Sequence, residues 1–185
     1  MEKELQNTIK ALQSGKTILY PTDTIWGIGC LASHEKGYTK LFEIKQRPEN
    51  KSVILLVCSI EMLNKYISDF PESVKKYLEN TDKPTTVIYN ASKNCPKHLV
   101  AKDGTIAIRI TNDPFCLALI EEVGEAITST SANISNEKNP TCFSEIDERI
   151  LLKIDYVVNW RQDEQTTKSS SEIIKIENNN IVKLR

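Results

Sequence analysis

The order in which strand-like and helix-like segments follow one another constrains this chain most. Short runs of β-branched and apolar residues alternate with stretches whose apolar residues recur every three or four positions. This alternation is typical of an α/β layer fold, in which helices connect the strands of one sheet. The C-terminal part departs from it, because two strand-like runs flank Asn178-Asn179-Asn180 and predict a hairpin. We therefore predict an α/β fold with a twisted, mixed sheet of parallel and antiparallel strands, flanked by helices.

Periodicity places the expected elements along the chain. Helices are expected over residues 5–12, 38–45, 114–123 and 143–152, and two short helices separated by Pro71 within 62–77. Strands are expected over residues 17–20, 52–57, 85–89, 105–110, 126–130, 156–158, 172–176 and 181–184. Gly15 should end the first helix, and Ser144 could cap the helix at 143–152. Residues 161–170 are polar without apolar periodicity, which predicts a mobile loop.

The clearest strand runs from Thr105 to Ile110 and carries a charge on one face. Its isoleucines alternate with Thr105, Ala107 and Arg109. Because successive side chains of a strand point to opposite faces, Thr105 and Arg109 should share the face that lacks the isoleucines. Arg109 could serve a ligand there, or it could form an ion pair at the surface of the sheet.

A hydroxyl-rich stretch follows the first expected strand. Pro21-Thr22-Asp23-Thr24 leads to Gly27 and Gly29, which we interpret as turn residues. Asp23 could act as an acid or orienting group, or simply form an Asx turn. Further on, Lys45 and Arg47 lie two residues apart before Pro48, and the helical stripe places Lys45 on the inward side. These residue types suit a pocket for a polyanion, although a surface loop and a solvated helix end would also explain them.

A second hydroxyl-rich stretch comes at the end of a later strand. Ser129, Ser131 and Asn133 share one face if the strand geometry continues to Asn133. So many polar groups at a strand end need partners if they are buried. They indicate either a ligand site or an ordinary polar turn. Strand ends of open α/β sheets are where ligands bind, which favours the first interpretation.

Composition limits the classes of protein that this chain can belong to. With 185 residues and 39% hydrophobic residues, it fits one compact domain spanning 1–185. The net charge of -1 gives no overall attraction to nucleic acid or membranes. Five scattered cysteines form no metal or redox motif and are expected to be free thiols in a reducing cytosol. The N-terminus lacks a signal-peptide pattern and the longest apolar run, 53–58, is too short for a membrane span, so we expect a cytoplasmic protein.

The sequence also argues against several catalytic chemistries. His34 and His98 are the two histidines, and neither lies beside a nucleophile motif, so we interpret both as ordinary surface residues. The sequence contains no phosphate-binding Gly-x-x-x-x-Gly-Lys loop and no dinucleotide glycine fingerprint. No cluster of carboxylates predicts a protein metal site.

Taken together, four motifs resemble the YrdC/TsaC family, the threonylcarbamoyl-AMP synthases of tRNA modification. They are Pro21-Thr22-Asp23-Thr24-Ile25-Trp26-Gly27-Ile28-Gly29, Lys45-Gln46-Arg47-Pro48, Thr105-Ile106-Ala107-Ile108-Arg109 and Ser131-Ala132-Asn133-Ile134-Ser135. The resemblance runs in order from about residue 12 to 144, with a weaker match at Ser171-Glu172-Ile173, and fits the short, single-domain form. It implies a twisted sheet curled around a large concave cavity.

The resemblance also implies a reaction. L-threonine, bicarbonate and ATP would give threonylcarbamoyl-AMP and pyrophosphate, the first step towards threonylcarbamoyladenosine in tRNAs that read ANN codons. ATP would be a substrate, with Mg²⁺ on its triphosphate, and the product would pass to a tRNA threonylcarbamoyl-transfer complex. Direct RNA binding is possible, and no membrane partner is implied.

The same resemblance assigns roles to matching residues. The catalytic group would comprise Lys45, Arg47, Ser131 and Asn133, which would also meet ATP. Further ATP contacts would come from Lys51, Thr105, Asn139 and Ser171, the last closing over the nucleotide as part of a lid. Thr24, Arg109 and Ser129 would bind threonine, with Arg109 gripping its carboxylate.

Four positions depart from the family pattern. Trp26 stands in place of tyrosine, Asn136 of glycine, Thr111 of proline, and Ser170 of a proline before the last motif. Asparagine tolerates the left-handed region, so the turn at Asn136 should survive. Two alternatives remain: a non-catalytic RNA-binding or ribosome-maturation module of the same fold, and an accessory of carbamoyl transfer. The near-neutral net charge weakens the first, since RNA affinity depends on phosphate neutralisation.

Overall fold

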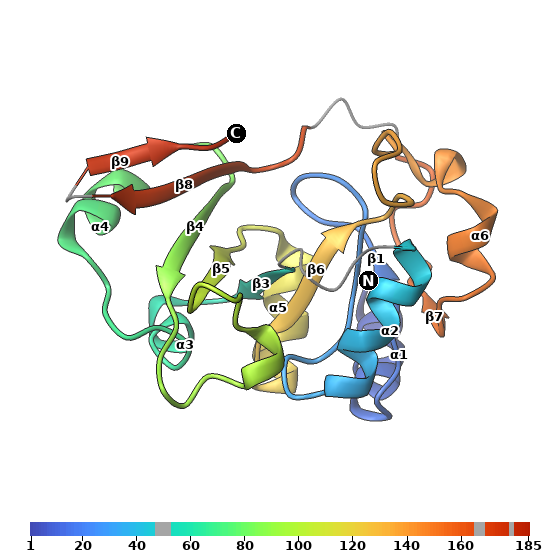
Figure 1. Cartoon of the computed structure of the whole chain (residues 1–185). Coiled ribbons are helices and arrows are strands. Elements are labelled where there is room, and N and C mark those ends of the chain that lie inside the picture. The colour runs from blue at the N-terminus through green and yellow to red at the C-terminus, as the bar shows by residue number, and fades with distance from the viewer. Residues whose placement is uncertain (47–52, 165–168, 178–179) are drawn as a thin grey trace.

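The computed structural model of the chain describes residues 1–46, 53–164, 169–177 and 180–185. These residues form a sheet of nine strands with helices packed around it (Figure 1). The helices are α1 Glu2–Gln13, α2 Glu35–Lys45, α3 Ile60–Leu63, α4 Glu72–Glu79, η1 Lys97–Leu99, α5 Pro114–Val123, η2 Phe143–Glu145 and α6 Glu148–Leu151. The strands are β1 Ile18–Tyr20, β2 Gly27–Gly29, β3 Ile54–Val57, β4 Thr85–Asn90, β5 Thr105–Ile110, β6 Ile127–Ser131, β7 Tyr156–Val157, β8 Glu172–Glu177 and β9 Asn180–Lys183.

The order of the strands brings distant parts of the sequence together. From one edge to the other it is β7-β1-β2-β6-β3-β5-β4-β8-β9. β7 runs parallel to β1, β5 to β3 and β8 to β4, whereas the other described neighbours are antiparallel. This confirms the expected mixed sheet. β6 lies between β2 and β3, so that Ser131 pairs with Gly27 and Ser129 pairs with Ile54.

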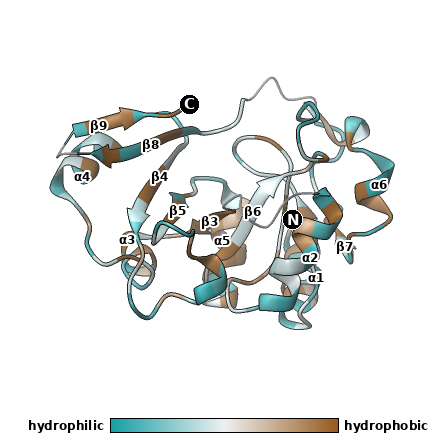
Figure 2. Cartoon of the chain, viewed as in Figure 1, coloured by the Kyte–Doolittle hydropathy of each residue, from teal (hydrophilic) through white to brown (hydrophobic). Residues whose placement is uncertain are grey.

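Two hydrophobic clusters hold the helices against the sheet. The larger cluster joins α1, α3, α4 and α5 to residues of β1 and β3–β6, and includes Tyr20, Leu56 and Phe115. The smaller cluster lies under α2 and α6, where Leu41 and Ile150 pack with residues of β1 and β2. In Figure 2 the β6 ribbon is pale, because its sequence Ile-Thr-Ser-Thr-Ser carries hydroxyls where neighbouring elements carry apolar residues. β6 therefore contributes polar side chains to the middle of the sheet.

Several local predictions are confirmed by the structure. β5 and α5 have the predicted bounds, and α5 has Asp113 as its cap, Pro114 in its first turn and Gly124 in the left-handed region after it. These are strong start and stop signals for a helix. Asn136 adopts a φ of 69°, so asparagine does form the left-handed turn. Lys45 is 3% exposed, as its inward helical phase predicted. The C-terminal hairpin is also present, and α4 begins directly after Pro71 as expected, whereas the other short helix, α3, spans Ile60–Leu63 and ends well before Pro71.

Three local predictions are wrong. The expected helix at 143–152 is split into η2 and the short α6, and its cap is Asp147, which accepts from the Arg149 backbone N–H, instead of Ser144. Gly27 and Gly29 lie inside β2 and form no turn. A Cβ on Gly29 would lie 1.8 Å from the Thr128 carbonyl oxygen, so the close approach of β6 requires glycine there.

The expected mobile loop at 161–170 begins with a fixed residue. Arg161 forms ion pairs with Asp113 and Glu164, because its guanidinium reaches a buried carboxylate. Ser170 and Ser171 line a cavity, and residues 165–168 lie outside the described ranges. Among the described helices, none is long and apolar enough to cross a membrane.

Candidate functional site

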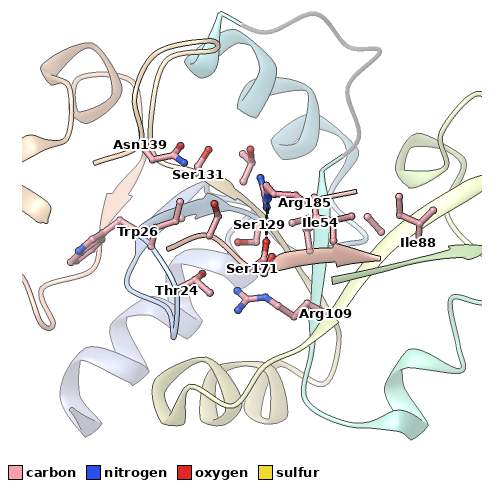
Figure 3. Close-up of a pocket in the computed structure, with 16 residues that line it drawn as sticks. Thr24, Trp26, Ile54, Ile88, Arg109, Ser129, Ser131, Asn139, Ser171 and Arg185 are labelled. Atoms are coloured by element: carbon pink, nitrogen blue, oxygen red, sulfur yellow. Dashed lines mark hydrogen bonds between the residues drawn. The ribbon is translucent and has the colours of Figure 1, made fainter. Parts of the chain in front are cut away.

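A cavity of about 280 Å³ opens on the face of the sheet that carries Ser129, Ile54, Ala107 and Ile88. These four residues are paired across β6, β3, β5 and β4, and paired residues share a face. Figure 3 shows Thr24, Arg109, Ser129 and Ser171 lying close together, from the loop after β1, β5, β6 and the C-terminal segment, whereas Trp26 and Ile88 lie at the edges of the group. The whole lining comprises Thr24, Ile25, Trp26, Gly27, Ile54, Ile88, Ala107, Arg109, Ser129, Thr130, Ser131, Asn139, Ser170, Ser171, Ile173 and Arg185.

Thr24 reaches this cavity from a loop that is braced by its own hydroxyls. Thr22 Oγ1 accepts from the Thr24 backbone N–H at 3.0 Å and lies 2.9 Å from Thr24 Oγ1. The same Thr22 hydroxyl donates to the Ile25 carbonyl at 2.9 Å. Thr22 and Thr24 are 4% and 6% exposed. The loop therefore holds the Thr24 hydroxyl in a fixed position at the cavity wall.

Arg109 is a buried cation whose carboxylate partner comes from this loop. Its Nη1 donates to Asp23 Oδ1 at 2.5 Å, and the two side chains are 4% and 16% exposed. The sequence left open whether Asp23 is an orienting group or forms an Asx turn. The ion pair shows that Asp23 orients Arg109. Among the described residues, Arg109 Nε is buried and has no hydrogen-bond partner. A buried donor without a partner is costly, so this end of Arg109 is a polar group that the described part of the chain leaves unsatisfied.

The Ser131–Asn133 segment is shaped by Lys45. The Lys45 ammonium donates to the carbonyl of Ser131, to the carbonyl of Asn133 at 2.7 Å and to Asn133 Oδ1 at 3.1 Å. Ser131 Oγ donates to Asn133 Oδ1 at 2.5 Å. The Asn133 amide in turn donates to the carbonyls of Ile134 and Glu137 at 3.0 and 2.7 Å. Ser131 lines the cavity, whereas Lys45 and Asn133 lie behind it.

A buried residue next to β2 was not selected from the sequence. Tyr20 is fully buried, and its ring lies next to Gly27 and Gly29, where a Cβ on Gly29 would come within 3.3 Å of the ring. Its hydroxyl donates to the Thr128 carbonyl at 3.1 Å. Burial raises the pKa of Tyr20, so the hydroxyl stays protonated and acts as a donor. Tyr20 thereby supports β6 immediately before Ser129.

The C-terminal segment forms a wall of the cavity. Ser171 is 5% exposed, its hydroxyl lies 2.8 Å from Thr86 Oγ1, and β8 continues from it in parallel with β4. The Arg185 guanidinium donates from Nε and Nη2 to the Ser171 carbonyl at 3.1 and 3.0 Å (Figure 3). Ser171 is therefore held by contacts with β4 and with the C-terminal arginine, and its expected role as part of a lid over the nucleotide stays a prediction. Arg185 was missed by the sequence analysis, because no motif surrounds it.

The structure brings together many of the residues selected from the sequence. Those that line the cavity are Thr24, Arg109, Ser129, Ser131, Asn139 and Ser171. Thr105 lies apart, in a second cavity of about 220 Å³ that also has Ile88 in its wall and contains Asn90 and Lys175. Thr105 Oγ1 donates to Asp103 at 2.6 Å. The predictions for Arg47 and Lys51 lie outside the described residues.

Neither histidine, and no Asp or Glu among the described residues, lines this cavity. His98 Nε2 lies 3.0 Å from the Ala32 carbonyl oxygen, and the His98 ring packs on Tyr38. His34 precedes α2, and its Nδ1 is buried without a partner among the described residues. Both are thus half-buried packing residues, not the ordinary surface residues that we expected. Within the described part of the chain, no three His, Cys, Asp or Glu side chains are placed to hold a metal ion.

Comparison with known proteins identifies the class to which this fold and site belong. Residues 10–185 match the family model Sua5_yciO_yrdC, described as "Telomere recombination". The chain belongs to this Sua5/YciO/YrdC family. It is 34% identical over 161 residues to a threonylcarbamoyl-AMP synthase of Pseudoalteromonas translucida, covering 83% of this chain and 86% of the relative. It is 35% identical over 188 residues to a putative threonylcarbamoyl-AMP synthase of Methanocaldococcus jannaschii, covering 100% and 86%.

Solved structures agree with the fold. P. abyssi Sua5 complexed with L-threonine superposes with a TM-score of 0.87 at 25% identity, and the match covers all of this chain and 54% of Sua5. The chain thus spans about half the length of that relative. E. coli YciO superposes with a TM-score of 0.83 at 22% identity over 100% of this chain and 89% of YciO, which shows the shared fold. The expected family and its mixed-sheet fold are therefore confirmed.

Proposed function

We propose that this protein is a threonylcarbamoyl-AMP synthase. It converts L-threonine, bicarbonate and ATP into threonylcarbamoyl-AMP, pyrophosphate and water. The observation that carries the proposal is Arg109, which lines a cavity rich in hydroxyls and is oriented there by its ion pair with Asp23. Support comes from relatives named threonylcarbamoyl-AMP synthase and from the family member crystallised with L-threonine.

The amino acid binds at the Arg109 end of the cavity. A guanidinium presents several donors in one plane and suits a carboxylate. The hydroxyls of Thr24 and Ser129 lie in the same cavity wall and serve the polar groups of threonine. Figure 3 shows the guanidinium end of Arg109 pointing towards Thr24, with Ser129 nearby. A small, zwitterionic, hydroxylated substrate matches this set of groups.

ATP occupies the opposite side, where β6 ends. Ser131 and Asn139 lie there together, and Ser171 and Arg185 face them across the cavity (Figure 3). Lys45 and Asn133 shape this end from behind Ser131. Arg47 and Lys51 are proposed as further phosphate contacts. Because Ile88 lines both cavities, a nucleotide that also reached Thr105 would extend past Ile88 into the second one.

The reaction requires alignment and charge neutralisation more than a protein nucleophile. The threonine amine captures bicarbonate as a carbamate with loss of water, a carbamate oxygen attacks the α-phosphorus of ATP, and pyrophosphate leaves. Holding both substrates in line can remove about 7–11 kcal/mol of the barrier in favourable cases. Cationic and hydroxyl donors stabilise the charge that develops on the phosphate. Mg²⁺ enters as part of the ATP substrate, held by phosphates and water.

The product is a reactive mixed anhydride, which suggests both shielding and a recipient. A walled cavity limits its hydrolysis until release. The recipient is a tRNA threonylcarbamoyl-transfer complex that forms threonylcarbamoyladenosine. A non-catalytic RNA-binding module would have no use for a buried arginine oriented towards hydroxyls inside a small cavity, and the net charge of -1 gives it little attraction for RNA.

The decisive experiment is pyrophosphate release from ATP with each substrate omitted in turn. We expect release only when L-threonine and bicarbonate are both present, together with formation of threonylcarbamoyl-AMP detected by mass spectrometry. ATP hydrolysis independent of threonine would contradict the proposal. Absence of any release, with RNA binding in a parallel assay, would favour the RNA-binding module.

A further inference from the structure

Arg161 has a backbone conformation that needs an explanation. Its φ is 59°, which lies in the left-handed region that residues other than glycine seldom occupy. Such a conformation persists where the surroundings stabilise it, and it often marks a site with a role. Arg161 does not line the cavity, yet its side chain is only 17% exposed. The contacts of its guanidinium are therefore the interactions that can stabilise this backbone conformation.

The first contact is with a buried carboxylate at the start of α5. Asp113 is 3% exposed, and its Oδ1 accepts from the backbone N–H groups of Phe115 and Cys116 at 3.0 and 3.1 Å. Its Oδ2 is bound by Arg161 Nη1 at 2.6 Å. Both oxygens of this carboxylate are thus occupied, one by the helix and one by the guanidinium. A buried charge requires such partners, so Asp113 fixes the position of Arg161.

The second contact joins Arg161 to the loop that carries Thr24. Arg161 Nη2 donates to the Thr22 carbonyl at 3.3 Å, while Nη1 remains on Asp113. The Thr22 hydroxyl bonds both the backbone N–H and the hydroxyl of Thr24, which lines the cavity. One planar guanidinium thereby connects the start of α5 to the threonine loop, residues 21–25. On the cavity side, Asp23 ties the same loop to Arg109.

We propose that Arg161 is a positioning residue for the amino-acid end of the cavity, acting through the Thr22 carbonyl to set the place of the Thr24 hydroxyl. This inference rests on the proposed function. The interaction is directional, because a guanidinium can bind a carboxylate and a carbonyl at once while an ammonium is a point charge. Losing Arg161 should therefore weaken binding of L-threonine much more than binding of ATP.

The test compares three variants with the parent protein by calorimetry and kinetics. Arg161→Gln removes the charge, Arg161→Lys keeps a charge near Asp113 without the fork, and Glu164→Gln removes only the exposed partner that Arg161 Nε contacts at 2.7 Å. We expect Kd and KM for L-threonine to rise about tenfold in both Arg161 variants. KM for ATP should change less than twofold. Glu164→Gln should behave like the parent, and Arg161→Lys should keep most of the melting temperature.

A second readout is independent of catalysis. Hydrogen exchange at the Thr24 amide, which donates to Thr22 Oγ1, should accelerate in Arg161→Gln and stay slow in Glu164→Gln. Unchanged threonine affinity in both Arg161 variants, or equal rises in KM for threonine and ATP, would overturn the inference. If the parent neither binds threonine nor releases pyrophosphate, the proposed function fails, and unchanged Thr24 exchange in Arg161→Gln would then reject the loop contact itself.

Discussion

Arg109 and Lys45 are both cations with 3% exposure near one cavity, but their surroundings differ. Arg109 faces the carboxylate of Asp23, which arrives from a loop 86 residues away in the sequence. Lys45 donates to oxygens of Ser131 and Asn133, including two backbone carbonyls. Arg109 also forms part of the cavity wall, whereas Lys45 lies behind Ser131.

The difference follows from the geometry of the two side chains. A guanidinium has five donors in a plane, so pairing with one carboxylate leaves donors for a ligand. An ammonium has three donors, and the described side-chain contacts of Lys45 lie on the Ser131–Asn133 segment. Arg109 is therefore suited to bind an anionic group directly. Lys45 is suited to shape a loop and to make that end of the cavity positive.

The largest effect is expected when the amino-acid substrate that binds at the Arg109 end of the cavity is changed. Valine keeps the shape of threonine but lacks its hydroxyl, so the hydroxyls of Thr24 and Ser129 in the cavity wall would lose the contact that threonine offers. Sites that read a hydroxyl can reject such an analogue by roughly ten-thousand-fold, whereas the single methyl missing from serine is worth about 1–3 kcal/mol. The measurement is kcat/KM for pyrophosphate release with each amino acid. Comparable values for valine and threonine would remove the case for a hydroxyl-reading pocket.

Replacing Arg109 should affect both binding and stability. Arg109→Gln leaves Asp23 without its cation, which costs about 3–5 kcal/mol for a buried pair, and threonine turnover should fall about a hundredfold. The control is the double variant Arg109→Gln with Asp23→Asn. It should recover much of the free energy of unfolding, measured by urea denaturation, without recovering threonine binding. Recovery of both would mean that Arg109 serves the fold alone.

Replacing Lys45 tests the other half of the comparison. Lys45→Met removes the donor for carbonyls of Ser131 and Asn133, and each buried acceptor left unsatisfied costs about 1–3 kcal/mol. We expect a lower melting temperature and a higher KM for ATP, with threonine affinity nearly unchanged in calorimetry. A variant with the parent's melting temperature and no ATP affinity would show instead that Lys45 is a direct phosphate ligand.

The smallest effects are expected for alanine variants of Ser131 and Asn133, which should differ in how much stability and how much turnover they lose. Asn133→Ala removes two donors to backbone carbonyls and an acceptor for Lys45, so it should cost about 1–3 kcal/mol of stability. Ser131→Ala should change stability by less than about 1 kcal/mol while lowering turnover, because its hydroxyl lines the cavity. Thermal unfolding and initial rates of both variants provide the measurement. Equal losses of stability would indicate that the two residues form only a structural turn.

Much of the local structure could be predicted because its causes are local. β5 and α5 were predicted with their observed bounds, since alternation of isoleucines and the signals at Asp113, Pro114 and Gly124 act within a few residues. The same holds for the inward phase of Lys45. The prediction of one helix over 143–152 was wrong, because Asp147 caps a new short helix within that range. The periodicity of apolar residues does not show where a cap interrupts a helix.

The sequence predicted the hydroxyl-rich and cationic motifs of the site one by one. It did not predict which of their residues contact one another. Nothing near Arg109 in the sequence indicates that Asp23 is its partner, and nothing near Arg185 indicates that its side chain reaches Ser171. Gly27 and Gly29 were interpreted as turn residues, because the strand that lies close to them, β6, is about 100 positions away in the sequence. Only the folded sheet shows that Thr128 of β6 leaves no room for a Cβ on Gly29. Tyr20 was missed for the same reason, since its hydroxyl bonds β6.

The sequence by itself determined the α/β class, the family, the faces of the strands and the set of polar residues at strand ends. These depend on side-chain periodicity and on turn and cap preferences, which are properties of short segments. The tertiary structure alone decided which of those residues meet. Placing β6 between β2 and β3 and β8 beside β4 brings Ser129, Arg109 and Ser171 around one cavity. That order is set by long-range packing of the whole sheet, because each strand must find the neighbours that bury its apolar face.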